Sequence, residues 1–165
     1  PAQSYRQPAR LFWNSGRGLS ENSFLPVPPE NCGPDLFEPM VGRGSAYADI
    51  DGDGDLDVLI TQVDGPARLL RNEQNLGRNW VRLKLAGRKG NMDAIGTRVR
   101  LRVGNRVLFQ HVVPTRGYLS QSELPITFGL GEASAVDDVQ ILWPDGTRET
   151  GGPLTVNALN VIRQK

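Results

Sequence analysis

Hydrophobic and polar residues alternate along several short segments of this chain, with the period of two that is typical of half-buried β-strands. In residues 98–103, three apolar side chains alternate with three arginines. In residues 80–85, Val81, Leu83 and Leu85 fall on one face. Because no apolar stripe at helical spacing persists over three turns, the pattern predicts an all-β fold.

Shorter apolar segments predict the remaining strands, at residues 45–48, 56–61, 67–71, 107–113, 139–143 and 155–162. Between strands 98–103 and 107–113 we expect a three-residue loop that places Val103 opposite Val107. The same register would place Leu101 opposite Phe109 and keep one face of the hairpin apolar.

The chain divides into two predicted regions at a junction near residues 75–79. Residues 1–76 are expected to form a propeller-type blade region, and residues 79–165 a small antiparallel β sandwich or barrel. Residues 14–44 are rich in glycine, proline, asparagine and serine. Proline removes a backbone donor and clashes with the preceding helical turn, so this segment cannot form a long helix.

The blade prediction starts from an internal repeat. Residues 8–14, Pro-Ala-Arg-Leu-Phe-Trp-Asn, recur 58 positions later as residues 66–72, Pro-Ala-Arg-Leu-Leu-Arg-Asn, with five of seven positions identical. A repeat of about 50 residues made of short strands is typical of propeller blades. Chance similarity in a short window is the alternative.

The charge of the chain is unevenly distributed. Its 165 residues include 19 Lys and Arg and 18 Asp and Glu, but five of the acids lie within residues 49–57. The basic residues are scattered and show no cluster with stacking aromatics, so we expect no nucleic-acid partner. No apolar run approaches the roughly 20 residues of a membrane span. The single cysteine, Cys32, excludes an internal disulfide framework and a multi-thiolate metal site.

The acidic segment 49–57 is the motif with the strongest chemical content. Its aspartates occupy alternating positions, at Asp49, Asp51, Asp53, Asp55 and Asp57. Carboxylates at positions 1, 3, 5 and 9 of a tight loop direct oxygens inward, whereas position 7 would contribute its backbone carbonyl. Gly52 and Gly54 permit the positive φ that such a loop requires. Oxygen-only ligation favours Ca²⁺ over Zn²⁺ or Cu²⁺, and the number of carboxylates favours it over Mg²⁺.

An EF-hand and a solvated turn are the two other interpretations of this loop. An EF-hand requires a glutamate at position 12, where Ile60 stands, and helical flanks where strands are predicted. A solvated turn is the other alternative, since Asp and Gly favour turns. Carboxylates about 4 Å apart repel by roughly 4 kcal/mol per pair at an effective dielectric near 20, so the loop is expected to be disordered until it is neutralised. Calcium would then have a structural role.

Residues 49–60 resemble the calcium-binding FG-GAP/VCBS repeat of β-propellers, which is seen in integrin α-subunit heads. The resemblance implies that Asp49, Asp51, Asp53 and Asp57 are side-chain ligands, and that Asp55 ligates through its carbonyl. It also implies that segments 8–14 and 66–72 are strands that close successive blades.

The C-terminal half resembles the ASPIC/UnbV domain. The matching stretches are Asn79-Trp80-Val81, Asn91-Met92-Asp93-Ala94-Ile95-Gly96-Thr97, Gly117-Tyr118-Leu119-Ser120-Gln121, Phe128-Gly129-Leu130-Gly131 and Trp143-Pro144-Asp145-Gly146. A repeat followed by this domain is the C-terminal arrangement of proteins similar to cartilage acidic protein. The resemblance implies calcium and a role in binding or adhesion, and a location that is extracellular, on the cell surface or periplasmic.

The chain departs from this family in its number of blades. Closed propellers have about 4–8 blades, whereas this chain has room for one complete blade and the end of another. A lone blade would leave apolar faces and strand edges uncovered. We therefore expect contact with other blades, packing on the second domain, or self-assembly.

Three function classes remain open. The first is a non-catalytic calcium-binding module for adhesion, matrix or glycan contact, or assembly, and the second is a subunit of a surface polymer or multi-protein complex. The third, ranked last, is a carbohydrate-active enzyme that uses Asp93 or Asp145. His111 is interpreted as an ordinary strand residue, because no Gly-x-Ser-x-Gly elbow accompanies it. Cys32 is a free thiol or an intermolecular link.

The arginines of the alternating strand, Arg98, Arg100 and Arg102, are a further candidate. A solvated sheet surface is the simpler interpretation. The functional one is capture of sulfated or carboxylated glycans by guanidinium groups. The sequence identifies no particular protein or glycan partner.

Overall fold

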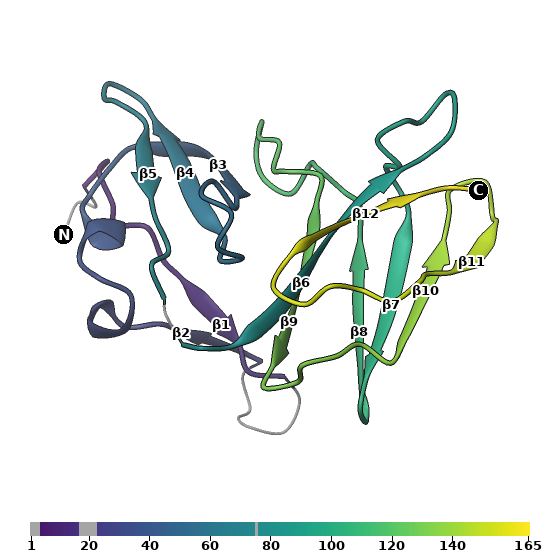
Figure 1. Cartoon of the computed structure of the whole chain (residues 1–165). Coiled ribbons are helices and arrows are strands. Elements are labelled where there is room, and N and C mark those ends of the chain that lie inside the picture. Colours follow the sequence, from purple (N-terminus) through teal and green to yellow (C-terminus); the bar gives the residue numbers. More distant parts are fainter. Residues whose placement is uncertain (1–3, 17–22, 75) are drawn as a thin grey trace.

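The computed structural model describes residues 4–16, 23–74 and 76–165 and confirms the all-β prediction (Figure 1). The described helices are two single turns of 3₁₀ helix in the proline-rich segment, Pro29–Asn31 and Asp35–Phe37. Within the described residues, no helix combines the length and apolar character needed to cross a membrane.

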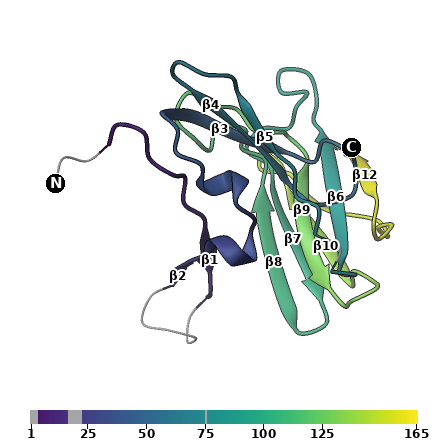
Figure 2. The same cartoon turned by 90° about the vertical axis from the view of Figure 1, so that its left-hand side faces the viewer.

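The N-terminal region contains two small antiparallel sheets. Strands β1 (Phe12–Asn14) and β2 (Phe24–Pro26) form a two-stranded sheet. Strands β3 (Gly42–Ala48), β4 (Asp57–Gln62) and β5 (Arg68–Leu70) form a three-stranded sheet in that order. Figure 2 shows β1, β2 and the short helices on one side of the molecule, and β6 and β12 on the opposite side.

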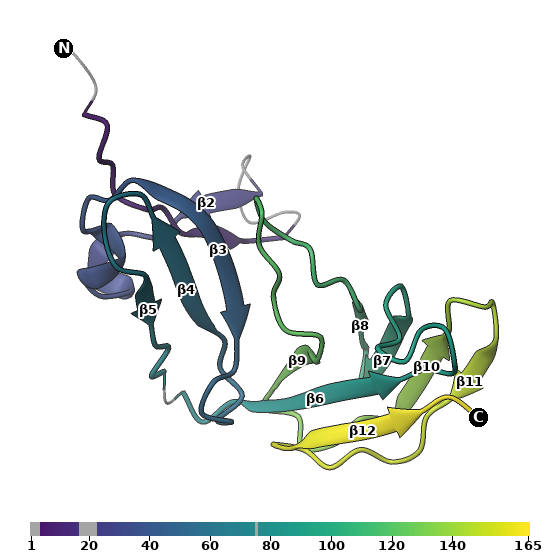
Figure 3. The same ribbon diagram turned by 90° about the horizontal axis from the view of Figure 1, so that it is seen from above.

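The C-terminal region contains two further sheets that face each other across the core (Figure 3). One sheet has the order β12-β6-β9, with bounds Leu159–Arg163, Asn79–Ala86 and Ile126–Gly131. The other has the order β11-β10-β7-β8, with bounds Arg148–Thr150, Asp138–Leu142, Arg98–Val103 and Arg106–His111. Neither sheet closes into a barrel. The prediction of a wholly antiparallel arrangement is wrong in one place, because β12 runs parallel to β6.

The hydrophobic core lies between these two C-terminal sheets. Alternation along β6 and β7 directs every second residue inward, so Val81, Leu83, Leu101 and Val99 are buried. Trp143, which follows β10, is also buried in this core. The N-terminal region buries few apolar side chains, so its sheets depend on contacts beyond their own interior.

The predicted three-residue loop of the β7–β8 hairpin is wrong. Val103 pairs with Arg106, so only Gly104 and Asn105 connect the two strands. Gly104 has a φ of +57°, and glycine at the first position of a two-residue loop is typical of a type II′ turn. The prediction of a three-residue loop overlooked this two-residue turn.

This one-residue shift changes which side chains of β8 share a face. Leu101 pairs with Leu108 rather than with Phe109, and Val107 pairs with an arginine rather than with Val103. Because a shift of one residue turns each side chain to the opposite face, Phe109 points outward and is 69% exposed. The expected apolar inner face of β8 is therefore wrong as well.

The two regions contact each other through the β3 sheet and the segment that precedes β9. The Tyr47 N–H donates to the Ser122 hydroxyl at 3.2 Å, and the Glu123 N–H donates to the Tyr47 carbonyl at 3.1 Å. A second contact joins Gly54 to the Trp80 indole, where an added Cβ would lie 2.0 Å from the ring. The acidic loop and the C-terminal region therefore pack closely together.

Candidate cation-binding loop

The acidic segment forms the connection between β3 and β4. Ala48 pairs with Asp57, so residues 49–56 make the loop of this hairpin. Figure 3 shows the loop beside the start of β6. Gly52 and Gly54 adopt φ values of +82° and +96°, which L-residues with side chains rarely adopt. The glycines thus allow the backbone to turn back on itself between the aspartates.

The loop brings three of the five aspartates together. Carboxylate oxygens of Asp49, Asp51 and Asp53 lie within 4.8 Å of one another. Calcium binds oxygen at about 2.3–2.6 Å, so two oxygens on one ion lie at most about 5 Å apart. The three carboxylates therefore fit a single Ca²⁺ ion. Asp55 and Asp57 are not members of this group.

Asp57 instead closes the base of the loop. Its side chain is buried, and its two oxygens accept the N–H of Asn72 at 2.8 Å and of Ile50 at 3.0 Å. These backbone hydrogen bonds, that from Asn72 first, lower the pKa of the Asp57 carboxyl below its ordinary value. Asp57 therefore remains ionised and joins the loop to the segment that follows β5.

The Asp49 side chain is fully enclosed, with 0% of its surface exposed. Oδ1 accepts the Gly52 N–H at 2.7 Å, and Oδ2 accepts the Gly54 N–H at 3.1 Å. Oδ2 also pairs with the Arg82 guanidinium, whose Nη1 lies 2.7 Å away. Because Arg82 lies on β6, the C-terminal region supplies the countercharge of this aspartate.

Arg82 is a buried link between the two regions. Besides Asp49, its guanidinium pairs with Glu123 and donates from Nε to the Thr127 hydroxyl at 3.2 Å. Sequence analysis did not identify Arg82 as part of the site. It shares the polar face of its strand with Lys84, which is exposed, and the alternation pattern does not distinguish the two.

A second arginine acts at the solvent side of the loop. Arg71, one residue after β5, pairs with Asp51 and also with Glu73 at 2.9 Å. Its side chain is half exposed, so it can move without disturbing the core. The expectation that repulsion leaves the loop disordered considered only its acids and omitted the two arginines.

The electrostatic balance of the loop is nevertheless negative. Burial raises the pKa of the Asp55 carboxyl, and repulsion from Asp53, Asp49, Asp57 and Asp51 raises it further. The Asp55 N–H donates to Asp53 Oδ1 at 2.9 Å, a turn contact that holds the backbone near the carboxylate group. A divalent cation would relieve this repulsion.

The other sequence candidates lie elsewhere. His111 is exposed on β8, and Cys32 is a free, half-buried thiol. Asp145 accepts the Thr147 N–H at 2.9 Å and the Gln164 amide at 2.7 Å, contacts that stabilise the turn after β10.

Comparison with known proteins identifies the C-terminal region at the level of a family. Residues 87–165 match the family model described as ASPIC and UnbV. This match supports the expected ASPIC/UnbV resemblance over these residues; the domain bounds 79–165 stay a prediction. The model does not extend to the N-terminal region, so the FG-GAP/VCBS repeat stays a prediction.

The chain is also similar to particular proteins. It is 31% identical over 150 residues to Cartilage acidic protein 1 of Xenopus tropicalis, an alignment that covers 87% of this chain and 22% of that protein. It is 32% identical over 117 residues to Cartilage acidic protein 1 of Homo sapiens, covering 68% of this chain and 17% of that protein. The chain thus spans about a fifth of the length of the curated relatives it matches.

Proposed function

We propose that residues 49–57 bind a Ca²⁺ ion, and that the chain is a non-catalytic, calcium-stabilised extracellular module used in adhesion or assembly. The observation that carries this proposal is the convergence of the Asp49, Asp51 and Asp53 carboxylates. This group lies in a loop closed by one buried aspartate and anchored to the C-terminal region by a buried arginine.

The hydrogen bonds of the loop leave room for an ion. A carboxylate has about four lone-pair positions, and Asp49 uses three of them on Gly52, Gly54 and Arg82. The carboxylates of Asp51 and Asp53 are less engaged. Direct ligation of Ca²⁺ by these three aspartates therefore requires no break in the contact between loop and β6.

The expected affinity supports an extracellular location. Three carboxylates, two of them already paired with arginine, give a modest ligand charge. Extracellular calcium modules bind with dissociation constants of about 10⁻⁴–10⁻³ M, whereas cytosolic sensors and buffers bind more tightly. Similarity to Cartilage acidic protein 1 supports the same assignment. In this role the ion holds the β3–β4 hairpin against the C-terminal domain.

Thermal unfolding during a calcium titration tests the proposal. Binding to the folded state alone adds RT ln(1 + [L]/Kd), or about 2.7 kcal/mol when calcium reaches 100 times its Kd. One of three ligands is lost in Asp53→Asn. We therefore expect this variant to need at least about ten times more calcium for the same increase in stability. Asp145→Asn, in an exposed turn outside the loop, is the matched control. An unchanged melting temperature at millimolar calcium would contradict the proposal.

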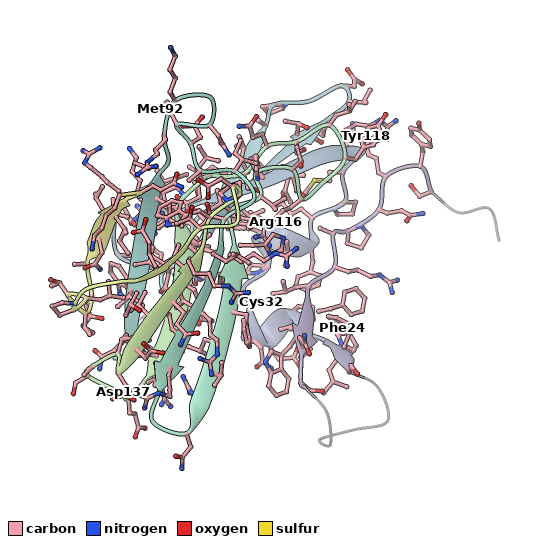
Figure 4. The ribbon with its side chains drawn as sticks, turned by 90° about the vertical axis from the view of Figure 1, so that its right-hand side faces the viewer. Phe24, Cys32, Met92, Arg116, Tyr118 and Asp137 are labelled. Carbon is pink, nitrogen blue, oxygen red and sulfur yellow. The ribbon has the colours of Figure 1, made fainter. Side chains whose placement is uncertain are left out.

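A second role, assembly with further blades or another copy of the chain, is favoured by exposed aromatic side chains. Phe12, Trp13 and Phe24 on the β1–β2 sheet are 51%, 54% and 61% exposed. Figure 4 shows Phe24 at the periphery of the molecule. Leu59 and Leu69 expose 41% and 48% of their surface on the neighbouring β3–β5 sheet. Exposed aromatic side chains are enriched at protein–protein interfaces.

Light scattering over a range of protein concentrations tests this second role. We expect a concentration-dependent increase in mass that Phe24→Ser weakens, whereas Tyr118→Ser, at an exposed aromatic of the C-terminal region, leaves it unchanged. A monomer at every concentration would contradict self-assembly by this chain.

A further inference from the structure

The outer face of the β11-β10-β7-β8 sheet carries an unusual row of cationic side chains. Strand pairing places Arg100 of β7 beside Phe109 of β8. On the other side of β7, Leu142 of β10 lies between Arg98 of β7 and Arg148 of β11. We call this surface the arginine face; its members are Arg98, Arg100, Arg102, Phe109 and Arg148.

The arginine face is open to solvent. The intervening residues of β7 point into the core, so the arginines point away from it. Arg98, Arg102 and Arg148 are exposed, and Phe109 exposes 69% of its surface. Exposure of a large aromatic beside several guanidinium groups is the observation that requires an explanation.

Acidic residues neutralise only one end of this face. Asp137 lies 3.5 Å from Arg102, and Asp138 lies 4.0 Å from Arg100. Within the part of the chain that the structure describes, Arg98 and Arg148 have no carboxylate within 4.0 Å. Four guanidiniums therefore face two carboxylates, and the positive charge is concentrated toward Arg98 and Arg148.

We propose that the arginine face binds a sulfated polysaccharide. Planar guanidinium groups donate paired hydrogen bonds that fit the oxygens of sulfate and carboxylate groups. Alternate residues of a strand lie about 6.6–6.8 Å apart, so the three arginines of β7 form a row about 13 Å long. A polymer with repeated anionic groups can contact several of them at once. The exposed ring of Phe109 offers an apolar surface to the C–H face of a sugar.

The position of the arginines in the sheet disfavours other polyanions. The three arginines of β7 lie on an inner strand, between β8 and β10, so the β7 backbone cannot pair with an acidic peptide strand. Arg148 lies on the edge strand β11, and the polyglutamate comparison below tests pairing there. Proteins that bind single-stranded nucleic acid stack successive bases on several aromatic side chains. On the described part of this face, the rings are Phe109 and the imidazole of His111, which pairs with Arg98, so there is no run of aromatic side chains. The proposal gives the adhesion of the proposed function a ligand of stated chemical class, but it does not rest on calcium binding.

Binding of the whole chain to immobilised heparin, and calorimetry with soluble heparin, test the proposal in calcium and in EDTA. We expect Arg98→Gln/Arg148→Gln to weaken binding at least about fivefold, as loss of exposed charge pairs predicts. The control variant Lys84→Gln/Arg163→Gln removes the same charge from the outer face of the opposite sheet. It should bind as the unaltered protein does. Phe109→Ala should weaken binding without a change in charge.

Three results would overturn the proposal. The first is absence of heparin binding at low ionic strength, and the second is an equal loss in the control variant, which would mean that net charge alone is responsible. The third is equal affinity for heparin, oligothymidylate and polyglutamate, which would indicate an unselective polyanion surface. Because binding in EDTA is measured separately, failure of calcium binding at the acidic loop leaves this test intact.

Discussion

Replacement of Arg82 by methionine removes the cation that lies between two buried carboxylates. The Asp49, Arg82 and Glu123 side chains are 0%, 7% and 13% exposed. Removing one partner of a buried ion pair costs about 3–5 kcal/mol, because the remaining charge has no compensation. Here two carboxylates would lose their partner, and Glu123 Oε1 already has no hydrogen bond among the described residues. We therefore expect a loss at the upper end of this range.

Urea unfolding in EDTA measures this loss without a contribution from calcium. For a chain of this size, 3–5 kcal/mol corresponds to a fall of about 6–20 °C in melting temperature. Arg78→Met is the control, because Arg78 pairs with Glu132 at 3.0 Å but is 58% exposed. An exposed pair contributes about 0–1 kcal/mol. Adding Glu123→Gln to the Arg82 variant should restore part of the stability. Similar losses in the Arg82 and Arg78 variants would refute the reasoning.

Further predictions concern the loop itself. Arg71→Gln should raise calcium affinity by up to about fivefold in a calorimetric titration, since an exposed cation paired with Asp51 no longer competes with the ion; a lower affinity would contradict this. Gly54→Ala should lower the melting temperature, because φ is +96° and the new Cβ would meet the Trp80 ring, whereas Gly152→Ala, with open space around it, should not. Asp57→Asn should destabilise the protein near pH 7. That difference should shrink once pH falls below the ordinary aspartate pKa of 3.8, and disappear when pH falls below the lowered pKa of the native carboxyl; a difference that persists in stronger acid would contradict it.

Most strand positions of the C-terminal region were predictable because burial of one sheet face imposes a period of two, but β9 and the short β11 were not among the predicted strands. The alternation at β6 and β7 placed Val81, Leu83 and Leu101 in the interior, where the structure has them. The hairpin register was not predictable to the same degree. Two- and three-residue loops both suit the Gly-Asn sequence, and one residue of difference reverses the faces of β8.

The chemistry of the acidic loop was predictable in part. Alternating aspartates and two glycines indicate a loop with convergent oxygens, and the structure groups Asp49, Asp51 and Asp53. The partners of these acids were not predictable from the sequence. Arg82 lies 33 positions after Asp49, and its burial depends on how the two regions pack. Parallel pairing of β12 with β6 was missed for the same reason, because such long-range contacts leave no periodic signal in the sequence.

A crystal structure grown in calcium would test the central claim most directly. We expect a single strong density peak between the carboxylates of Asp49, Asp51 and Asp53, with calcium–oxygen distances of about 2.3–2.6 Å and the Asp49–Arg82 pair intact. Side chains of these three aspartates that turn into solvent around ordinary water density, in a crystal saturated with calcium, would contradict the account.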